Sequence, residues 1–358
     1  MSKLEFVVIG YGHIGKRHAG IIRDLGFEVR VYDKLGFEGD GPGDSGAGRA
    51  GRDLPVRIEL TRDLGGHEEL ARGLAAAGEL RAAGELRGVA AICTPNYLHC
   101  GQAIEWMWKG YDVVLEKPMG LSAAACREVI GVAKELDRRV FCVMQNRYSP
   151  PSAWLKDLIG SDRMGKIYQV QINCLWNRSS AYYEQSSWKG KLREDGGTLF
   201  TQFSHFVDTL LWLFGDVRVQ HARFQNFNHP YIDFEDSGFF DFEILKGGVG
   251  TFTYSTSAHG QNLESSITIL AEHGSVKVGG QYMEQVLACN IEGYVMPDLL
   301  PTLPPNDYGT YKGSASNHAM VYANVLDVLA GKAEIHCTPE EGLRVVELIE
   351  EVYKNRIL

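Results

Sequence analysis

The fold expected for the first part of the chain is decided by the stretch Leu4-Glu5-Phe6-Val7-Val8-Ile9-Gly10-Tyr11-Gly12-His13-Ile14-Gly15. Its first half is a short apolar run, typical of a buried parallel strand, and it ends in a glycine-rich loop. Apolar residues then recur with helical spacing over His13–Leu25, and a second apolar strand, Val29–Asp33, ends in an acid. Strand, helix and strand at this spacing predict a right-handed βαβ unit.

The glycine loop has the pattern Gly10-x-Gly12-x-x-Gly15, which between a strand and a helix predicts a dinucleotide site. The first glycine permits the tight turn, the second lets the backbone approach a pyrophosphate, and the third permits close helix packing. Asp33 is placed to accept from the ribose hydroxyls and would repel a 2′-phosphate, so we expect NAD rather than NADP. Lys34 can offset that repulsion. The alternative is a glycine-rich turn followed by an incidental acid.

Alternation of strands and helices continues as far as residue 145. A polar, glycine-rich loop is expected over 35–52. The expected strands and helices follow in the order 67–86 (helix), 89–93 (strand), 98–109 (helix), 113–115 (strand), 122–136 (helix) and 140–143 (strand). Such alternation predicts a doubly wound parallel sheet, so residues 1–145 form the expected dinucleotide-binding Rossmann domain.

The sequence pattern changes after Pro150-Pro151, where period-two segments dominate. The expected strands are 167–175, 217–224, 236–244, 249–255, 265–271 and 275–278, and the expected helices are 153–158, 203–214, 318–329 and 339–354. Gly247-Gly248 marks a hairpin turn, and the prolines at 301, 304 and 305 a loop. Residues 146–358 therefore form an expected second domain of α+β class, with antiparallel strands and closing helices packing back.

The composition and net charge of the chain disfavour several classes of partner. The chain has 358 residues and a net charge of -9, which disfavours a nucleic-acid partner. Its seven cysteines are odd in number and form no C-x-x-C pair, which indicates reduced thiols in a cytoplasmic protein and no zinc or other metal site. No apolar run reaches the length that a membrane helix needs, so no membrane partner is expected.

Chemistry-bearing residues follow the expected strands. Glu116-Lys117-Pro118 comes directly after the strand 113–115, at the sheet edge where ligands bind in open α/β folds. Thr94 and Asn96 follow the strand 89–93 in the same way and could hydrogen-bond a cofactor near its ribose. His205, on an expected helix, is a natural proton acceptor near neutral pH. Asp208 lies on the same helix face and either orients the ring or only pairs with it. A solvated lysine and a core histidine are the alternatives.

Two further segments suit a charged, flat ligand. The segment 176–193 is dense in Trp, Tyr, Arg and Lys, and it includes Tyr183, Trp188 and Lys189. It could contact a base and phosphates, or it could form a domain-interface aromatic cluster. Arg147, at the end of the last Rossmann strand, offers planar donors to a carboxylate or phosphate.

Three motifs, in order along the chain, resemble the glucose–fructose oxidoreductase, inositol dehydrogenase and rhizopine-catabolism (Gfo/Idh/MocA) family. They are the glycine loop continuing to Arg17-His18, the Glu116-Lys117-Pro118 segment, and Gly196-Gly197 followed by His205 and Asp208. Within the family, Ile92–His99 and Ser187–Gly190 look most like UDP-2-acetamido-2-deoxyglucuronate 3-dehydrogenases of polysaccharide biosynthesis.

The resemblance implies a fold, an activity and a set of site residues. It implies an open-faced, largely antiparallel C-terminal sheet that forms homodimers or homotetramers, and a cis Lys117–Pro118 peptide bond. It implies oxidation of a secondary hydroxyl, at C3 of a UDP-linked N-acetylated uronic acid, with Lys117 and His205 catalytic. Implied cofactor contacts are Gly10, Gly12, His13, Ile14, Gly15, Asp33, Thr94, Asn96, His99, Glu116 and Lys117. Implied substrate contacts are Lys117, Arg147, Tyr183, Trp188, Lys189, Thr201 and His205.

One departure bears on the substrate. Many family dehydrogenases carry an aspartate four residues before the histidine, where this chain has Thr201. The nucleotide-sugar subgroup also lacks that acid, so the change fits this subgroup and weighs against an inositol dehydrogenase with an Asp–His relay. Dehydrogenation of a free sugar or an inositol and a non-catalytic NAD- or sugar-binding regulator are the alternatives.

Overall fold

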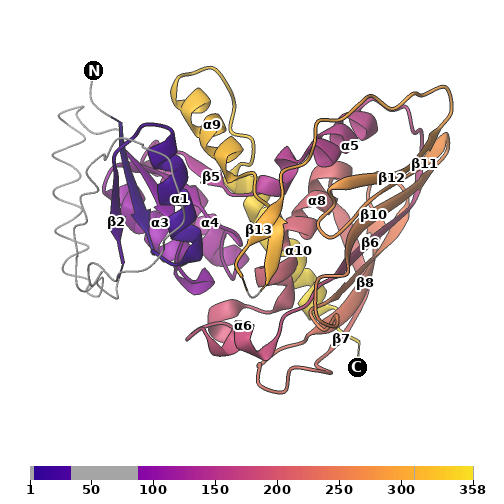
Figure 1. Ribbon diagram of the computed structural model, residues 1–358, viewed down its shortest axis with the longest axis horizontal. Coiled ribbons are helices and arrows are strands. Elements are labelled where there is room, and N and C mark those ends of the chain that lie inside the picture. Colours follow the sequence, from indigo (N-terminus) through magenta and orange to yellow (C-terminus); the bar gives the residue numbers. More distant parts are fainter. Residues whose placement is uncertain (1–3, 34–87, 310, 358) are drawn as a thin grey trace. The chain divides into compact units, whose positions relative to one another are not determined.

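A computed structural model describes residues 4–33, 88–309 and 311–357 of the chain (Figure 1). Lys34, the expected loop 35–52 and the expected helix 67–86 lie outside the described residues. The chain separates into two compact units. Unit 1 holds residues 1–94, 98–116 and 128–141, and unit 2 holds residues 95–97, 117–127 and 142–358. The predicted domain boundary at residue 145 stays a prediction.

Unit 1 is built on a five-stranded sheet with the strand order β2-β1-β3-β4-β5. Its strands are β1 (Glu5–Ile9), β2 (Val29–Tyr32), β3 (Gly88–Ile92), β4 (Tyr111–Leu115) and β5 (Val140–Cys142). The ladders of β1 with β2 and β3, and of β3 with β4, are parallel. Every residue of β3 and β4 is buried, as expected for strands covered on both faces.

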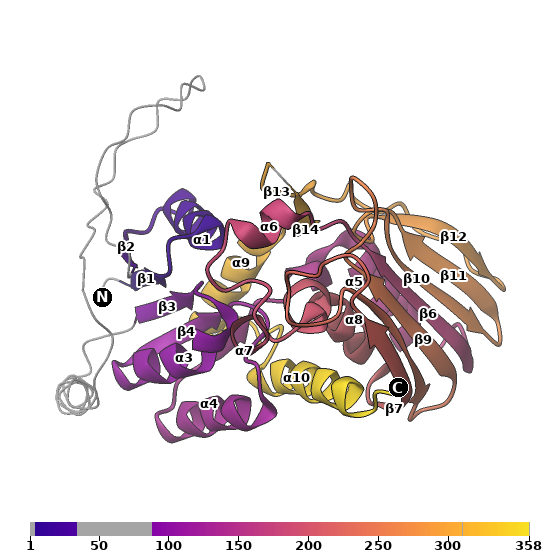
Figure 2. The ribbon, with the colours of Figure 1, turned by 90° about the horizontal axis from the view of Figure 1, so that it is seen from below.

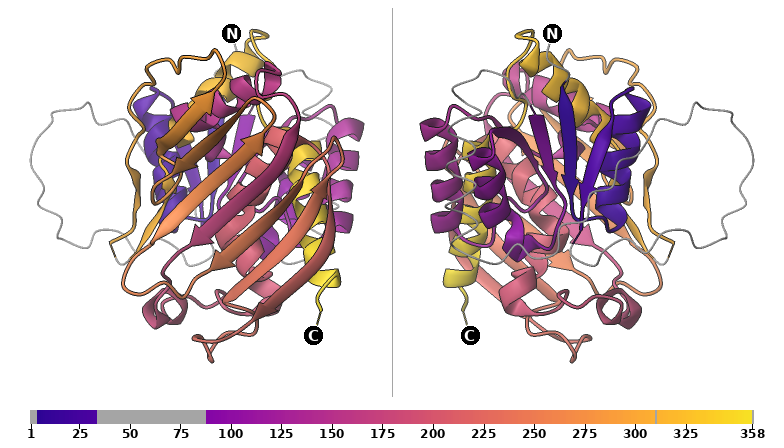
Figure 3. Two further views of the ribbon diagram at one scale, coloured as in Figure 1. Left: turned by 90° about the vertical axis from the view of Figure 1, so that its right-hand side faces the viewer. Right: turned by 90° about the vertical axis from the view of Figure 1, so that its left-hand side faces the viewer.

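Helices cover both faces of this sheet, with α1 (His13–Asp24) on one face and α3 (His99–Trp108) and α4 (Ala123–Glu135) on the other (Figures 2 and 3). A short helical turn, η1 (Asn96–Leu98), precedes α3. Gly26 ends α1 with a φ of 85°, and the Ser122 hydroxyl accepts from the amide of Ala125 at 3.2 Å, as a helix N-cap does. The predicted doubly wound parallel sheet is confirmed.

Unit 2 is built on a seven-stranded sheet with the strand order β12-β11-β10-β6-β9-β8-β7. Its strands are β6 (Ile167–Leu175), β7 (Val217–Gln225), β8 (Ser237–Ile244), β9 (Val249–Ser255), β10 (Glu264–Ala271), β11 (Gly274–Gly279) and β12 (Gln285–Ile291). The β6–β9 ladder is parallel and the other ladders are antiparallel, which confirms the largely antiparallel sheet. Gly247 and Gly248, both at positive φ, make the predicted hairpin between β8 and β9.

One face of this sheet carries helices and the other does not, within the described part of unit 2 (Figures 1 and 3). The helices on the covered face are α5 (Pro150–Gly160), α8 (Ser204–Phe214) and α10 (Pro339–Lys354). The core between them is aromatic: Phe203, Phe206 and Tyr254 are almost fully buried, and the Trp176 ring packs edge-on against Phe206. The alternation of apolar and polar residues along β6 and β9 thus places their apolar residues on this core.

Several elements of unit 2 were not expected from the sequence. They are η2 (Gln145–Tyr148), α6 (Ser180–Glu184), α7 (Leu192–Asp195), a π-helical turn η3 (Leu199–Phe203), the strand β12, and the paired strands β13 (Pro305–Asp307) and β14 (Lys312–Ala315). The expected loop holds at Pro301 and Pro304 but was wrong at Pro305, which begins a strand: a proline is tolerated at the first residue of a strand. Helix α9 (His318–Leu329) has the bounds that its sequence predicted.

Across the described residues, no helix combines the length and the apolar character needed to cross a membrane.

Candidate active site

The glycine loop of unit 1 joins β1 to α1 and leaves space at one of its three glycines. A Cβ at Gly15 would lie 1.8 Å from the carbonyl oxygen of Gly10, and a Cβ at Gly10 would lie 2.9 Å from that of Cys93. These two glycines therefore serve packing within the protein. A Cβ at Gly12 would meet no atom of the described residues within 4 Å, so with respect to them the backbone there is open to a ligand.

The start of α1 suits an anion. Its first turn holds no acidic residue and, among the described residues, its N-cap Gly12 makes no side-chain cap hydrogen bond, so the positive end of the helix dipole favours an anion there. His13 is exposed and Ile14 half-buried at this helix start. The loop and the helix start together fit a dinucleotide pyrophosphate.

Asp33 lies beside the loop at the end of β2. Its Oδ2 accepts from the backbone amide of Tyr11 at 2.6 Å, which places the carboxylate next to the glycine loop. At the end of the neighbouring strand β3, the hydroxyl of Thr94 donates to Gln102 at 2.6 Å. The His99 ring contacts the carbonyl oxygen of Thr94 at 2.8 Å and so fixes this corner. The polar residues named from the sequence therefore surround the carboxyl ends of β1, β2 and β3, where the strand order reverses and ligands bind.

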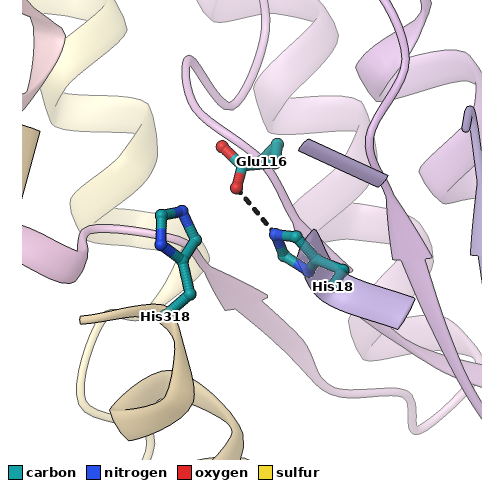
Figure 4. A group of neighbouring side chains, drawn as sticks. All are labelled: His18, Glu116 and His318. Atoms are coloured by element: carbon teal, nitrogen blue, oxygen red, sulfur yellow. Dashed lines mark hydrogen bonds and ion pairs between the residues drawn. The ribbon is translucent and has the colours of Figure 1, made fainter. Parts of the chain in front are cut away.

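Glu116 follows β4 and is paired within unit 1. Its Oε1 lies 2.9 Å from Nε2 of His18 on α1, and both side chains are buried (Figure 4). The Glu116-Lys117-Pro118 motif alone does not indicate this partner; in the structure it is His18, 98 positions earlier in the chain. This pair fixes the end of β4, from which the chain continues into Lys117.

Lys117 belongs to unit 2 and is half-buried. Its ammonium group donates to the backbone carbonyl of Thr201 at 2.8 Å. Thr201 lies in the π-helical turn that leads into α8, and such turns are frequent at functional sites. The Lys117–Pro118 peptide bond is cis, as the resemblance implies. Lys117 is thus held against the turn that ends one residue before α8.

His205, in the first turn of α8, is 2% exposed. Its Nε2 lies 3.2 Å from the amide nitrogen of Gln145, whose same nitrogen lies 3.2 Å from the hydroxyl of Ser314. An amide nitrogen only donates, so Nε2 is the acceptor and the ring is neutral in this arrangement. The carbonyl that accepts from Lys117 thus belongs to Thr201, four residues before His205 in the chain.

Thr201 also joins two other polar side chains. The Nδ2 group of Asn96 donates to the Thr201 hydroxyl at 2.7 Å and to the Asp195 carbonyl at 2.9 Å. The Thr201 hydroxyl in turn donates to the Asp195 carboxylate. Asn96 is predicted as a cofactor contact, and the structure gives it this further role.

Arg147 is tied into the protein by four hydrogen bonds. Its Nε and Nη2 donate to the two carboxylate oxygens of Asp208 at 2.8 and 2.6 Å, and its Nη1 donates to Glu341 and to the backbone of His336. It is 2% exposed. This geometry corrects its assignment as a substrate contact, because its donor groups join η2, α8 and α10. Asp208, considered as an orienter of His205, has both oxygens bound by Arg147.

The aromatic and basic segment 176–193 folds into a compact cluster. The Lys189 ammonium lies 3.8 Å from the Tyr182 ring centroid, and burial lowers the pKa of Lys189. The ring of Tyr183 is buried, packs edge-on against Tyr182, and has a raised pKa because of burial. Trp188 is half-buried. The assignment of Tyr183, Trp188 and Lys189 as substrate contacts stays a prediction.

Sequence reasoning missed His18, Asp195, Gln145 and Ser314 as parts of the site. Gln145 and Asp195 had a signal, because each lies in a polar motif next to an expected element. His18 belongs to a motif of the family resemblance but had no role assigned to it, and Ser314 had no signal; their partners lie 98 and 169 positions away in the chain.

Known proteins resemble both units. Residues 80–144 match the model of the oxidoreductase family with an NAD-binding Rossmann fold, GFO/IDH/MocA, and residues 153–277 match the GFO/IDH/MocA C-terminal domain. The solved WlbA dehydrogenase from Bordetella pertussis, in complex with NADH and UDP-GlcNAcA, is 28% identical with a TM-score of 0.75, over 99% of this chain and 96% of that one.

Curated relatives are more distant. The scyllo-inositol 2-dehydrogenase (NADP(+)) IolW of Bacillus subtilis is 24% identical over 74% of this chain and 75% of its own length. The uncharacterised oxidoreductase sll0816 of Synechocystis sp. is 28% identical over 38% of this chain, and the match spans 37% of that relative's length. The match to the Rossmann family model confirms the predicted NAD-binding fold.

Proposed function

Because this chain belongs to the GFO/IDH/MocA family of oxidoreductases, we propose that it is an NAD-dependent dehydrogenase that oxidises a secondary hydroxyl of a nucleotide-linked sugar. One observation carries the proposal. Lys117, a hydrogen-bond donor with a positive charge, is bound to the carbonyl of Thr201, and His205, a neutral base, follows one turn later. Oxidation of an alcohol needs a base that accepts the hydroxyl proton and a donor that stabilises the developing alkoxide, and these two residues can supply them.

The proposed substrate is a UDP-linked N-acetylated uronic acid oxidised at C3, in polysaccharide biosynthesis. Two features support this choice. The WlbA dehydrogenase that binds UDP-GlcNAcA is similar over nearly the whole chain. The position four residues before His205 holds a threonine and not an acid, as in the nucleotide-sugar subgroup that the sequence resembles.

His205 is the proposed proton acceptor. The substrate hydroxyl would displace the Gln145 amide from Nε2 and transfer its proton to that nitrogen, because a neutral histidine is a suitable base near pH 7. Gln145 would then remain hydrogen-bonded to Ser314 and border the site.

Lys117 is the proposed electrostatic donor. Its ammonium group is fixed by the bond to the Thr201 carbonyl, and an ammonium group is a donor that carries a positive charge. Negative charge develops on that oxygen as its proton leaves, and a positive group already fixed beside it stabilises this charge without rearrangement. When NAD is bound, its nicotinamide ring supplies the hydride acceptor.

Substrate binding is assigned to the segment 176–193. Tyr183, Trp188 and Lys189 offer two aromatic rings and a cation, which suits a base and a diphosphate. Arg147 is left out of this set because Asp208 and Glu341 occupy its donors. The face of the seven-stranded sheet without helices is the proposed surface for a homodimer or homotetramer.

A substrate screen tests the proposal. UDP-sugars and free polyols are offered with NAD and with NADP, and NADH formation is followed by absorbance. Turnover of a UDP-linked uronic acid, inhibited by free UDP, is expected. Turnover of inositols or free sugars without inhibition by UDP would contradict the nucleotide-sugar assignment, and no turnover with any of them would favour a binding regulator.

A variant with His205→Ala tests the base separately. Its pH–rate profile should lose the limb that reflects protonation of the histidine. An unchanged profile would remove His205 as the base.

A further inference from the structure

Asp195 is a buried carboxylate in the centre of the polar cluster around Thr201. It ends α7, it is 1% exposed, and its Oδ2 accepts from the backbone amide of Gly190 at 2.7 Å. Its Oδ1 accepts from the Thr201 hydroxyl. Both oxygens thus accept from uncharged donors, although the group is placed where a charged carboxylate is costly.

Contacts lead from this carboxylate to Lys117 through a single residue. The Thr201 hydroxyl donates to Asp195, and the Thr201 carbonyl accepts from Lys117. Asn96 donates to the Thr201 hydroxyl and to the Asp195 carbonyl, which fixes the relative position of the two. The hydroxyl of Thr201 therefore accepts from Asn96 and donates to Asp195, whose carboxylate and backbone carbonyl both lie within its reach.

The charged and titratable groups around Asp195 come from several elements. Lys189 and Lys117 are the cations that interact with it, and Tyr182 and Tyr183 are the phenols. Burial raises the pKa of Asp195 to about 6, while the Thr201 and Gly190 hydrogen bonds and the two lysines lower it. The carboxylate is therefore ionised at pH 7 and above, where alcohol oxidation is favoured.

We propose that Asp195 is a positioning residue for Lys117: acting through the Thr201 hydroxyl, its carboxylate holds the ammonium group of Lys117 against the turn that leads to His205. The negative charge favours the ammonium form of Lys117, since an opposite charge nearby stabilises an ionised group. The hydrogen bonds fix the carbonyl to which the ammonium group donates. This inference rests on the proposed function, because it assigns Asp195 to the same site.

A purely structural role for Asp195 makes a different forecast. Its bond to the Gly190 amide fixes the loop before α7, and loss of that bond would change the fold of the loop. It would not change the charge state of Lys117. The decisive measurement is therefore the protonation of Lys117 and not activity alone.

The experiment uses the full chain with isotope-labelled lysine side chains and follows Lys117 by NMR across pH, in the absence of substrate. The Lys117 signal is identified by its loss in Lys117→Met. In Asp195→Asn, which keeps the shape of the side chain and removes its charge, the titration midpoint of Lys117 should fall by about one pH unit. The kcat should fall roughly tenfold or more, with little change in KM for NAD, because the positioning of one catalytic group is lost.

Thr201 and Asp233 supply the matched variants. Thr201→Val should shift the midpoint in the same direction and lower kcat, while Thr201→Ser, which keeps the hydroxyl, should restore both. If Asp195→Asn does not fold, the Lys117 titration in Thr201→Val and Thr201→Ser tests the inference instead. Asp233→Asn is the control, since that exposed carboxylate also accepts a backbone amide, at 3.2 Å from Leu192, and should leave the midpoint unchanged.

An unchanged Lys117 midpoint in both Asp195→Asn and Thr201→Val would overturn the inference, whatever the activity. A shifted midpoint in a protein that oxidises no sugar would support the pairing of Asp195 with Lys117 and reject the proposed function. An active enzyme with an unchanged midpoint would reject the inference alone.

Discussion

The glycine loop of unit 1 and the polar cluster of unit 2 are built in opposite ways. The loop is one contiguous stretch, and it presents backbone groups. The cluster draws Asn96, Lys117, Asp195, Thr201 and His205 from separate elements, and it presents side chains. A site made of backbone groups can be specified by a short sequence motif. A site made of side chains depends on which distant segments the fold brings together.

This difference has a physical cause. The loop needs positions without a Cβ and a helix start, and both are local properties of the chain. The cluster needs buried polar groups that satisfy one another, because a buried polar group without a partner is costly. Such partners come from any part of the sequence.

The largest expected effect is on the cluster. Lys117→Met should lower kcat roughly a thousandfold, about 4 kcal/mol of transition-state stabilisation, because the charge beside the developing alkoxide is removed. Binding of NAD, measured by calorimetry, should persist. The exposed Lys332→Met is the control and should turn over normally. Near-normal turnover by Lys117→Met would refute the role of Lys117.

A second buried carboxylate makes the stability of unit 2 depend on pH. Burial raises the pKa of Glu235 to about 7 from its ordinary 4.5, and the Tyr353 hydroxyl donates to it at 2.7 Å. Between these two values the folded state binds more protons than the unfolded state, so stability falls as pH rises from 4.5 to 7. Glu235→Gln should remove a cost of about 3 kcal/mol at pH 8 and be neutral near pH 4.

Chemical denaturation at both pH values measures this effect. The exposed Glu243→Gln, on β8, is the matched control and should show no difference between the two pH values. Equal stability of Glu235→Gln and the unmodified protein at pH 8 would contradict the cost assigned to the buried charge.

Two substitutions in the glycine loop, three residues apart, should affect different properties. Gly15→Ala should lower stability, whereas Gly12→Ala should lower the affinity for NAD. Gly15→Ala places a Cβ 1.8 Å from the Gly10 carbonyl and should destabilise unit 1 by about 2 kcal/mol, as overpacking does. Gly12→Ala meets no atom of the part of the chain that the structure describes, so thermal unfolding should be unchanged while NAD affinity falls. A loss of NAD binding with unchanged stability in Gly15→Ala would reverse the assignment of these glycines.

The smallest expected effect is at Asp33. Asp33→Ala should raise the Kd for NAD about tenfold, near 1.4 kcal/mol, because the ribose hydroxyls lose a charged acceptor. The Kd for NADP should rise less or fall, since a negative charge that repels a 2′-phosphate is removed. An unchanged ratio of the two dissociation constants would show that another group discriminates between the cofactors.

Much of the unit 1 fold and its cofactor loop could be predicted from the sequence. The spacing of apolar residues placed α1 and β2 within one residue, and the three glycines indicated the loop. In unit 2, β6, β9, α9 and α10 have their predicted bounds, since periodicity is a local signal. The strand β12 was missed, because most of its residues are exposed or half-buried and carry little alternation.

The sequence by itself determined the residue types and the local elements: a glycine loop, an acid after β2, a lysine after β4 and a histidine on α8. Only the tertiary structure decided their partners. In the folded chain Glu116 pairs with His18, and the donors of Arg147 bind Asp208 and Glu341. Lys117 is connected to Asp195 through Thr201. Periodicity is a property of neighbours in the chain, whereas the pairing of buried polar groups is settled when the core closes and each must find a partner.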